Sequence, residues 1–371
     1  MVMAFLRRHW WWIVPLLIFD IFFFIWLWNR PDDDGFPETQ KVAAEDREKV
    51  TQEPETEGLV YGYPTEQRSL HKTESIEVYQ PTASGRVQSA LYGSVRTVQR
   101  SGRLRPSFHA GLDIAAMRRD RRGRPLDEIY AVADGEVAYI NRIGGNSSYG
   151  IYVVLLHQDP AGDIYTLYAH MASAEDSLDA GQEVRRGDVL GIMGNTASTG
   201  IPMHRAHLHF EIGVVNNMRF HSWYRKQDLI PDHGTFHGHN LTAADPLALY
   251  GEGGDEIVFS MLDHLREEAP AFELVFRHDR HLDYFERYPG LWKGPRHDGE
   301  AIWMAVSHGG VPLKGRTATD EEAGDLGNGS SVVVSVNEDV LGRNGRHLVV
   351  RRGSGWQVGR NGERMLEIFS Y

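Results

Sequence analysis

Hydrophobic and polar positions divide this chain into unlike parts. Residues 10–28 are almost wholly apolar, interrupted by Pro15 and Asp20. This run is close to the ~20 residues that an α-helix needs to cross a bilayer. Beyond residue 128, short apolar or alternating runs recur between glycine and aspartate turns, a pattern typical of β-strands. The pattern predicts strands at residues 129–132, 135–140, 152–156 and 164–168.

Charges around the apolar run predict its orientation. Arg7 and Arg8 precede it, an aspartate run that begins at Asp32 follows it, and tryptophans cluster at both of its ends. By the positive-inside rule, the amino end lies in the cytoplasm and the rest of the chain outside. A cleavable signal peptide is the alternative, but its apolar core would be shorter and a small-residue cleavage site would follow. We therefore predict a cytoplasmic stub and an uncleaved transmembrane anchor over residues 1–30.

The segment after the anchor, residues 31–74, is acidic and polar with little apolar periodicity. Such a composition does not bury enough surface to fold alone, so it predicts a flexible linker. The whole chain has a formal net charge of −12, which argues against nucleic acid as a partner. It contains no cysteine, which excludes thiol chemistry and cysteine metal sites.

Two histidine motifs carry the candidate chemistry. In the first, His109 precedes Asp113 by four residues, and we interpret the pair as flanking a turn into a strand. The second, residues 207–211, alternates polar and apolar side chains, so His207 and His209 share one face of a strand. Two imidazoles and a carboxylate, with a position left for water, are the ligands that a catalytic zinc site needs.

The flanking segments make these motifs specific, because with 18 histidines in the chain either motif alone arises easily by chance. The segments follow one another in a fixed order: FHAGLDIAA (108–116), YAVADGEV (130–137), YGIYVVL (149–155), TLYAHM (166–171), GQEVRRGDVLGIMG (181–194) and HLHFEI (207–212). With them, residues 85–224 resemble the lysostaphin-type (LytM-like) zinc metallopeptidases, which cut peptide cross-links in bacterial cell walls.

The resemblance implies roles for five residues. His109, Asp113 and His209 correspond to the ligands of a zinc ion (Zn2+). His170 and His207 correspond to the pair of catalytic histidines. All five positions hold the residue type that the family requires, which separates this chain from relatives that have lost ligands.

The resemblance also implies an antiparallel β-sheet with the site in a groove. The predicted fold class is mainly β: an antiparallel-sheet LytM-like catalytic domain over residues 75–250, an N-terminal transmembrane helix, and a C-terminal β-rich α+β extension over residues 251–371. Within this extension the spacing of apolar residues predicts a helix over 256–267. Strands are expected at 331–336, 347–351 and 365–369, with glycine turns at 342–345 and 359–362.

The role of residues 251–371 stays open at this point. A wall-binding or partner-binding module would give the chain an envelope protein as a partner. A structural extension packed against the catalytic domain is the alternative.

Zinc chemistry accounts for a hydrolase with this set of residues. Zinc lowers the pKa of bound water toward neutrality and polarises a scissile carbonyl. The sequence has no His-Glu-x-x-His motif, so histidine, whose pKa lies near neutral, replaces the usual glutamate base. We assign His170 and His207 jointly to orienting and deprotonating the water and to protonating the leaving amine.

The predicted function is a zinc-dependent endopeptidase that hydrolyses the peptide cross-links of bacterial peptidoglycan, with the peptide stems as substrate. The predicted location is the bacterial inner (cytoplasmic) membrane, with the catalytic domain on the periplasmic or extracytoplasmic side. Two alternatives share the fold: a noncatalytic zinc-binding envelope scaffold or amidase activator, and a zinc peptidase that acts on an envelope protein.

Two segments depart from the family pattern. Residues 117–128 contain a run of arginines where a short turn is usual, and they form either a solvated loop or a wall of the groove that meets substrate carboxylates. Residues 201–206 are inserted before His207 and could reshape the cleft, while His204 within them is an incidental histidine. A later glycine-rich connection is expected to cap the groove, with a second metal site as the alternative, and it contains His233, His237 and His239.

Overall fold

The computed structural model describes residues 58–371, except 101–102, 228, 231, 252–253, 255–256, 279–281 and 296–300. The predicted anchor over residues 1–30 lies outside the described residues, as does the predicted linker up to residue 57. Among the residues that the structure does describe, no helix combines the length and the apolar character needed to span a membrane. The described residues, from 58 onward, belong to one unit by their contacts.

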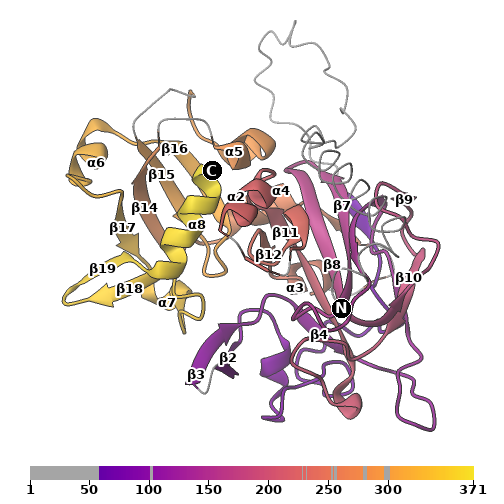
Figure 1. The fold of residues 1–371 in the computed structure, drawn as a ribbon. Helices are drawn as coiled ribbons and strands as arrows, with labels where there is room; N and C mark the ends of the chain where they lie inside the picture. Colours follow the sequence, from indigo (N-terminus) through magenta and orange to yellow (C-terminus); the bar gives the residue numbers. More distant parts are fainter. Residues whose placement is uncertain are drawn as a thin grey trace, which may run out of the picture. The chain divides into compact units, whose positions relative to one another are not determined.

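A nine-stranded sheet lies at the centre of the predicted peptidase domain (Figure 1). Its main path runs in the order β12-β11-β8-β7-β6-β9, with β4 beside β11 and with β10 beside both β5 and β8. Every pair is antiparallel. The strands are β4 (Leu112–Ala115), β5 (Glu128–Tyr130), β6 (Gly135–Asn141), β7 (Ile151–Asp159), β8 (Gly162–Ala174), β9 (Glu183–Val184), β10 (Val189–Met193), β11 (His207–Val215) and β12 (Leu241–Ala244). The predicted mainly β, antiparallel architecture is confirmed.

Strand β11 is buried along its whole length. On one face, Leu208 and Phe210 belong to the main hydrophobic core. His207 and His209, which alternate with these two residues, point to the opposite face because strand side chains alternate. The alternating pattern predicted a half-buried strand, whereas here the polar face is covered as well, which removes the two histidines from bulk solvent.

The start of the described chain corrects one prediction. Residues 58–74, which their composition assigned to the flexible linker, pack into the fold. β1 (Leu59–Tyr61) pairs with β13 (Ile257–Phe259), and Tyr61 and Leu70 are fully buried. The average composition of residues 31–74 is polar, so these few apolar side chains did not stand out in the sequence. They are nevertheless enough to pack the segment against the core that the rest of the chain forms.

Several short elements surround the sheet. An antiparallel hairpin, β2 (Val95–Arg100) and β3 (Arg103–Phe108), precedes β4. The single-turn and short helices of this region are η1 (Val87–Ala90), η2 (Met203–Arg205), α2 (Phe220–Lys226), η3 (Gly234–Phe236) and α3 (Leu247–Tyr250).

The region after β13 contains a second, four-stranded antiparallel sheet with helices around it. Its strand order is β16-β15-β14-β17, and a separate hairpin joins β18 to β19. The strands are β14 (Phe272–Arg277), β15 (Ala301–Val306), β16 (Pro312–Thr317), β17 (Ser331–Val336), β18 (Val349–Arg352) and β19 (Gly355–Val358). The helices are α4 (Met261–Glu267), α5 (Asp283–Arg287), η4 (Pro289–Leu291), α6 (Asp320–Asp325), α7 (Glu338–Leu341) and α8 (Arg360–Ser370).

Two predictions in this region are wrong in detail. Residues 365–369, predicted as a strand, lie in helix α8, and Gly359 is the N-cap of that helix instead of a turn residue. A short apolar run can form either a strand or a helix. Here the helix forms because it packs Met365 and Phe369 into the core. The helix predicted at 256–267 begins only at Met261, because the residues before it pair with β1 as a strand.

Hydrogen bonds join this second sheet region to the first. The Tyr288 hydroxyl donates to the Asp163 carbonyl oxygen at 2.7 Å and accepts from the Val215 backbone N–H at 3.1 Å. The Asn217 side-chain amide donates to the Ile368 carbonyl oxygen at 2.6 Å. Since Tyr288, Val215, Asn217 and Ile368 are buried, the carboxy-terminal region packs against the central sheet, as the structural-extension alternative requires.

Candidate metal centre

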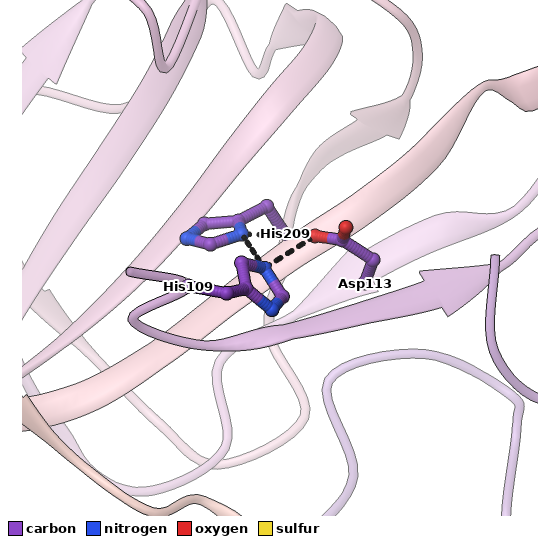
Figure 2. Close-up of side chains that lie close together, drawn as sticks. All are labelled: His109, Asp113 and His209. Atoms are coloured by element: carbon purple, nitrogen blue, oxygen red, sulfur yellow. Dashed lines mark hydrogen bonds and ion pairs between the residues drawn. The ribbon is translucent and has the colours of Figure 1, made fainter. Parts of the chain in front are cut away.

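Three side chains from two distant segments of the sequence converge beside the central sheet. Figure 2 shows the imidazoles of His109 and His209 and the carboxylate of Asp113 turned toward one another. His109 Nε2 lies 2.9 Å from Asp113 Oδ1 and 3.1 Å from His209 Nδ1, and the third separation, His209 Nδ1 to Asp113 Oδ1, is 3.0 Å. None of the three side chains is more than 8% exposed.

Strand pairing brings two of these residues together. β4 and β11 are antiparallel neighbours, and Asp113 lies directly opposite His209 in their register. His109 reaches the same place from the turn between β3 and β4. Gly111 is needed in this turn, because a Cβ atom there would lie 2.2 Å from the Phe210 carbonyl oxygen. The turn-into-strand interpretation of the first motif therefore agrees with the structure.

The outward nitrogens of the two imidazoles fix which nitrogen faces inward. His109 Nδ1 lies 2.9 Å from the Leu91 carbonyl oxygen, an acceptor, so it carries the proton. His209 Nε2 in the same way donates to Glu211 Oε1 at 2.8 Å. The inward nitrogens then present lone pairs to the Asp113 carboxylate. Three acceptors at mutual contact with no proton between them repel one another unless a cation lies among them.

The donor set fits zinc. Ligand atoms about 2.1 Å from a tetrahedral zinc ion lie about 3.4 Å from one another, close to the separations found here. Arg96 forms an ion pair with Asp113 Oδ2, which leaves Oδ1 to face the histidines. Two imidazoles and one carboxylate oxygen would thus hold the ion and leave a fourth position for water. Among the described residues, these three form the one group of histidines and acids with this convergence.

Burial and mutual interactions shift the pKa values of all three candidate ligands. Burial lowers the pKa of His109 to about 4 despite the neighbouring Asp113. Burial alone would raise the pKa of Asp113, but His109 and Arg96 hold it well below its usual range. For His209, burial is outweighed by hydrogen bonds to Asp113 and Glu211, which raise its pKa to about 9. Without a metal ion, a proton on His209 would therefore take the place of the cation.

The two predicted catalytic histidines lie at the edge of this group. The His170 and His207 rings are 4.9 Å apart between centroids, and the His170 ring is 5.7 Å from that of His209. His207 Nε2 lies 3.3 Å from Asp113 Oδ1. His170 has a φ of 62°, a left-handed conformation that costs energy in a residue with a Cβ and is concentrated at functional sites. The five predicted residues are thus together, and their roles stay predictions.

The two segments that depart from the family pattern contact each other. The Arg119 guanidinium donates to the carbonyl oxygens of Met203 and Ala206 at 3.0 and 2.9 Å. Arg118 forms an ion pair with Glu66 in which both side chains are exposed, and the other arginines of the run are exposed apart from the half-buried Arg119. His204 is exposed and is not a member of the converging group.

The histidine-rich connection does not form a second three-residue metal group among the described residues. His233 Nδ1 lies 3.1 Å from the Tyr139 hydroxyl, and the His237 ring stacks near that of His239 with centroids 4.9 Å apart. All three line a cavity together with Phe108 and Ala110, the two neighbours of His109 in the sequence, and the capping of a groove by this connection stays a prediction.

Sequence reasoning missed the residues that support the ligands. The buried carboxylate of Glu211 accepts hydrogen bonds from Tyr149 at 2.8 Å and from Tyr165 at 2.9 Å, as well as from His209. The position of Glu211, two residues after His209 on the same strand face, was the available signal. Arg96 and Tyr149 had no such local signal.

Comparison with known proteins agrees with this geometry. Residues 107–220 match the model of peptidase family M23, a family of zinc peptidases. Residues 107–220 are therefore similar to family M23, and the predicted resemblance to the lysostaphin-type peptidases is confirmed for this part of the chain.

Solved structures of this kind are distant from the chain. A zinc-containing peptidase from Vibrio cholerae is 24% identical with a TM-score of 0.23, over 36% of this chain and 35% of that one. Csd3 of Helicobacter pylori is 18% identical with a TM-score of 0.28, over 56% and 39%. The catalytic domain of lysostaphin from Staphylococcus simulans is 19% identical with a TM-score of 0.26, over 43% and 88%. The chain thus spans less than half of the length of the first two structures.

Proposed function

We propose that this chain is a zinc-dependent endopeptidase that hydrolyses the peptide cross-links of bacterial peptidoglycan. One observation carries the proposal: three buried proton acceptors converge with the spacing of zinc ligands, and two further histidines lie against them. The family M23 match over the same residues supports a metallopeptidase. Peptidoglycan as the substrate class comes from the resemblance to the lysostaphin-type enzymes.

The chain's own residues supply the groups that a hydrolysis needs. His109, Asp113 and His209 would hold the zinc ion, which when bound supplies a Lewis acid and lowers the pKa of water. His170 and His207 would move the protons. His170 Nδ1 lies 2.9 Å from the Thr196 carbonyl oxygen and so carries the proton, which leaves a lone pair on Nε2.

The protonation state of His170 suits a base. Burial, together with the neighbouring imidazoles of His207 and His209, holds its pKa well below the usual range. His170 is then neutral at physiological pH and able to accept a proton. His207 Nδ1 donates to the Arg205 carbonyl oxygen at 2.7 Å, which fixes its ring beside Asp113. The two histidines together would orient the water, accept its proton and return one to the leaving amine.

The location belongs to the same proposal. The apolar run at residues 10–28 and the basic residues before it support an anchor in the bacterial inner membrane. The catalytic domain would then face the periplasmic or extracytoplasmic space, where peptidoglycan lies.

Digestion of purified peptidoglycan by the full-length chain tests the function, with mass spectrometry of the released fragments. Loss of cross-linked dimers that stops with a chelator, and that is absent in the His209→Ala variant, is the expected result and would identify the bond. No cleavage by the zinc-loaded chain would overturn the proposal in favour of a noncatalytic scaffold or a peptidase that acts on an envelope protein.

A further inference from the structure

A cavity of about 740 Å³ adjoins the segment that carries His109, although the three candidate ligands do not line it. It is lined by Phe108 and Ala110, the two neighbours of His109 in the sequence, and by Tyr149, which holds Glu211 behind His209. Its other wall includes Arg346, which comes from the carboxy-terminal region. A smaller cavity of about 320 Å³ continues from it, since the two have several lining residues in common, Arg346 among them.

The charge of these cavities differs from that of the chain. The sequence has 51 acidic residues against 39 basic ones. Among the described residues that line either cavity there is no aspartate or glutamate, whereas Arg346 lines both and Arg364 lines the smaller one. An acidic protein therefore presents a cavity with positive charge next to the segment that carries His109, which favours an anionic ligand.

The guanidinium of Arg346 has hydrogen-bond donors available for an anionic ligand. No carboxylate among the described residues forms an ion pair with it, and its buried Nε atom has no hydrogen-bond partner. Its guanidinium stacks on the ring of Phe108, 4.8 Å from the centroid. A guanidinium has five N–H donors in a planar fork that matches the two oxygens of a carboxylate.

The loop that carries Arg346 is held in place. Gly345 lies so close to the β2–β3 hairpin that a Cβ atom would be 2.6 Å from Val95 Cγ2. Asn344 and His347, on either side, both have left-handed φ values, and the Asn344 side chain donates to the Val349 carbonyl oxygen at 2.9 Å. The guanidinium is therefore fixed relative to Phe108 and so to His109.

Two histidines of the cavity, His233 and His237, are polar groups that are uncharged at neutral pH. Burial, with the neighbouring His239 and His233, lowers the pKa of His237 to about 3. Burial also lowers the pKa of His233. At neutral pH these two imidazoles are neutral hydrogen-bonding groups, so Arg346 supplies the permanent positive charge of the larger cavity.

We propose that this cavity is a subsite for a carboxylate of the peptide substrate, which Arg346 binds through its guanidinium. The proposal rests on the proposed peptidase function and refines it: the preferred substrate has a free carboxylate a short distance from the scissile bond. It also gives the carboxy-terminal region a part in substrate selection.

Paired substrates test the subsite on the full-length, zinc-loaded chain. One is a purified cross-linked muropeptide dimer with free carboxylates, and the other is the same dimer with its carboxylates converted to amides. The wild type should have the higher kcat/KM on the free acid. Arg346→Gln should lower that value at least tenfold and leave the amidated dimer within twofold. Arg343→Gln, an exposed arginine of the same loop, should match the wild type on both.

Equal effects of Arg346→Gln on both dimers, or no effect on either, would overturn the subsite while hydrolysis itself supports the peptidase. If the chain cleaves neither dimer, the peptidase function fails, and the subsite is judged by binding to the His170→Ala variant. Tighter binding of the free acid that is lost when Arg346→Gln is added supports the subsite. Equal binding of both dimers overturns it.

Discussion

Glu211 accepts a hydrogen bond from His209 Nε2 at 2.8 Å, on the side of the imidazole that faces away from the candidate metal position. Tyr149 and Tyr165 donate to the two oxygens of the same carboxylate, so that its orientation is fixed on both sides. A carboxylate behind a ligand histidine holds the ring in one orientation and raises the basicity of the inward nitrogen. Glu211 is therefore a support for metal binding, although it does not reach the other ligands.

Glu211→Gln should weaken zinc binding by about 10- to 100-fold, because it removes the negative charge behind His209 but keeps the side-chain size. Zinc affinity can be measured by competition with a chromogenic chelator. Glu183→Gln, an exposed change on β9, is the matched control and should keep wild-type affinity. If the zinc affinity of Glu211→Gln equals that of the wild type, the hydrogen bond between Glu211 and His209 does not contribute to metal binding.

His170→Asn should leave zinc bound and lower the rate of hydrolysis by about 10²- to 10⁴-fold, the usual contribution of a proton-transfer residue. Asparagine suits the left-handed φ of 62° at this position, so the backbone should not change. Zinc content is measured by metal analysis, and the rate on a cross-linked muropeptide dimer. The exposed His204→Asn is the control and should be fully active. Loss of zinc in His170→Asn would place this residue among the ligands instead.

The candidate ligands of the site could be predicted from the sequence, but the residues that hold them in place could not. His109, Asp113 and His209 were predictable because their motifs are local: the first two are four positions apart across a turn, and His209 alternates with His207 on one strand. The partner of Asp113, Arg96, lies on another hairpin, and only the fold brings its guanidinium there. Arg346 stacks on Phe108, a residue more than 200 positions earlier in the chain, and nothing in its local sequence marks it.

The fold, like the site, was predictable where the signal is local and was not where it depends on contacts between distant residues. Strands of the central sheet were predictable because glycine and aspartate turns separate their apolar runs. Residues 365–369 were not, because a run of apolar side chains without clear alternation suits a strand or a helix equally. Tertiary packing decides such cases, as it does for Tyr61, whose burial depends on a partner strand about 200 residues away.

Arg119→Met should lower the hydrolytic rate by about 5- to 100-fold without loss of zinc. Arg119 holds residues 203–206 through two carbonyl oxygens, and the neighbouring Arg205 carbonyl holds the His207 ring. A small misplacement of a catalytic group is enough for such an effect. Hydrogen exchange should increase at residues 201–206. The exposed Arg121→Met removes an equal charge from the same loop and should change neither quantity. A normal rate despite faster exchange would show that this loop does not position His207.

His157 should make the stability of the fold depend on pH. It is buried between the Asp134 carbonyl oxygen, 2.8 Å from Nδ1, and the Thr166 hydroxyl, 2.7 Å from Nε2. Burial lowers its pKa to about 4, against about 6.5 in the unfolded chain. Between these two values the unfolded state binds a proton that the folded state does not. Folding is therefore favoured at higher pH, and this contribution is lost as the pH falls from about 6.5 toward 4.

The variant His157→Gln isolates this contribution, because it removes the titrating group but keeps a polar side chain. Between pH 7 and pH 5 the wild type should lose about 2 kcal/mol more unfolding free energy than the variant, measured by urea denaturation at both values. The exposed His71→Gln is the matched control and should follow the wild type. If wild type and His157→Gln lose the same free energy, His157 takes up its proton in the folded state as readily as in the unfolded one, and its two hydrogen bonds do not hold the ring neutral.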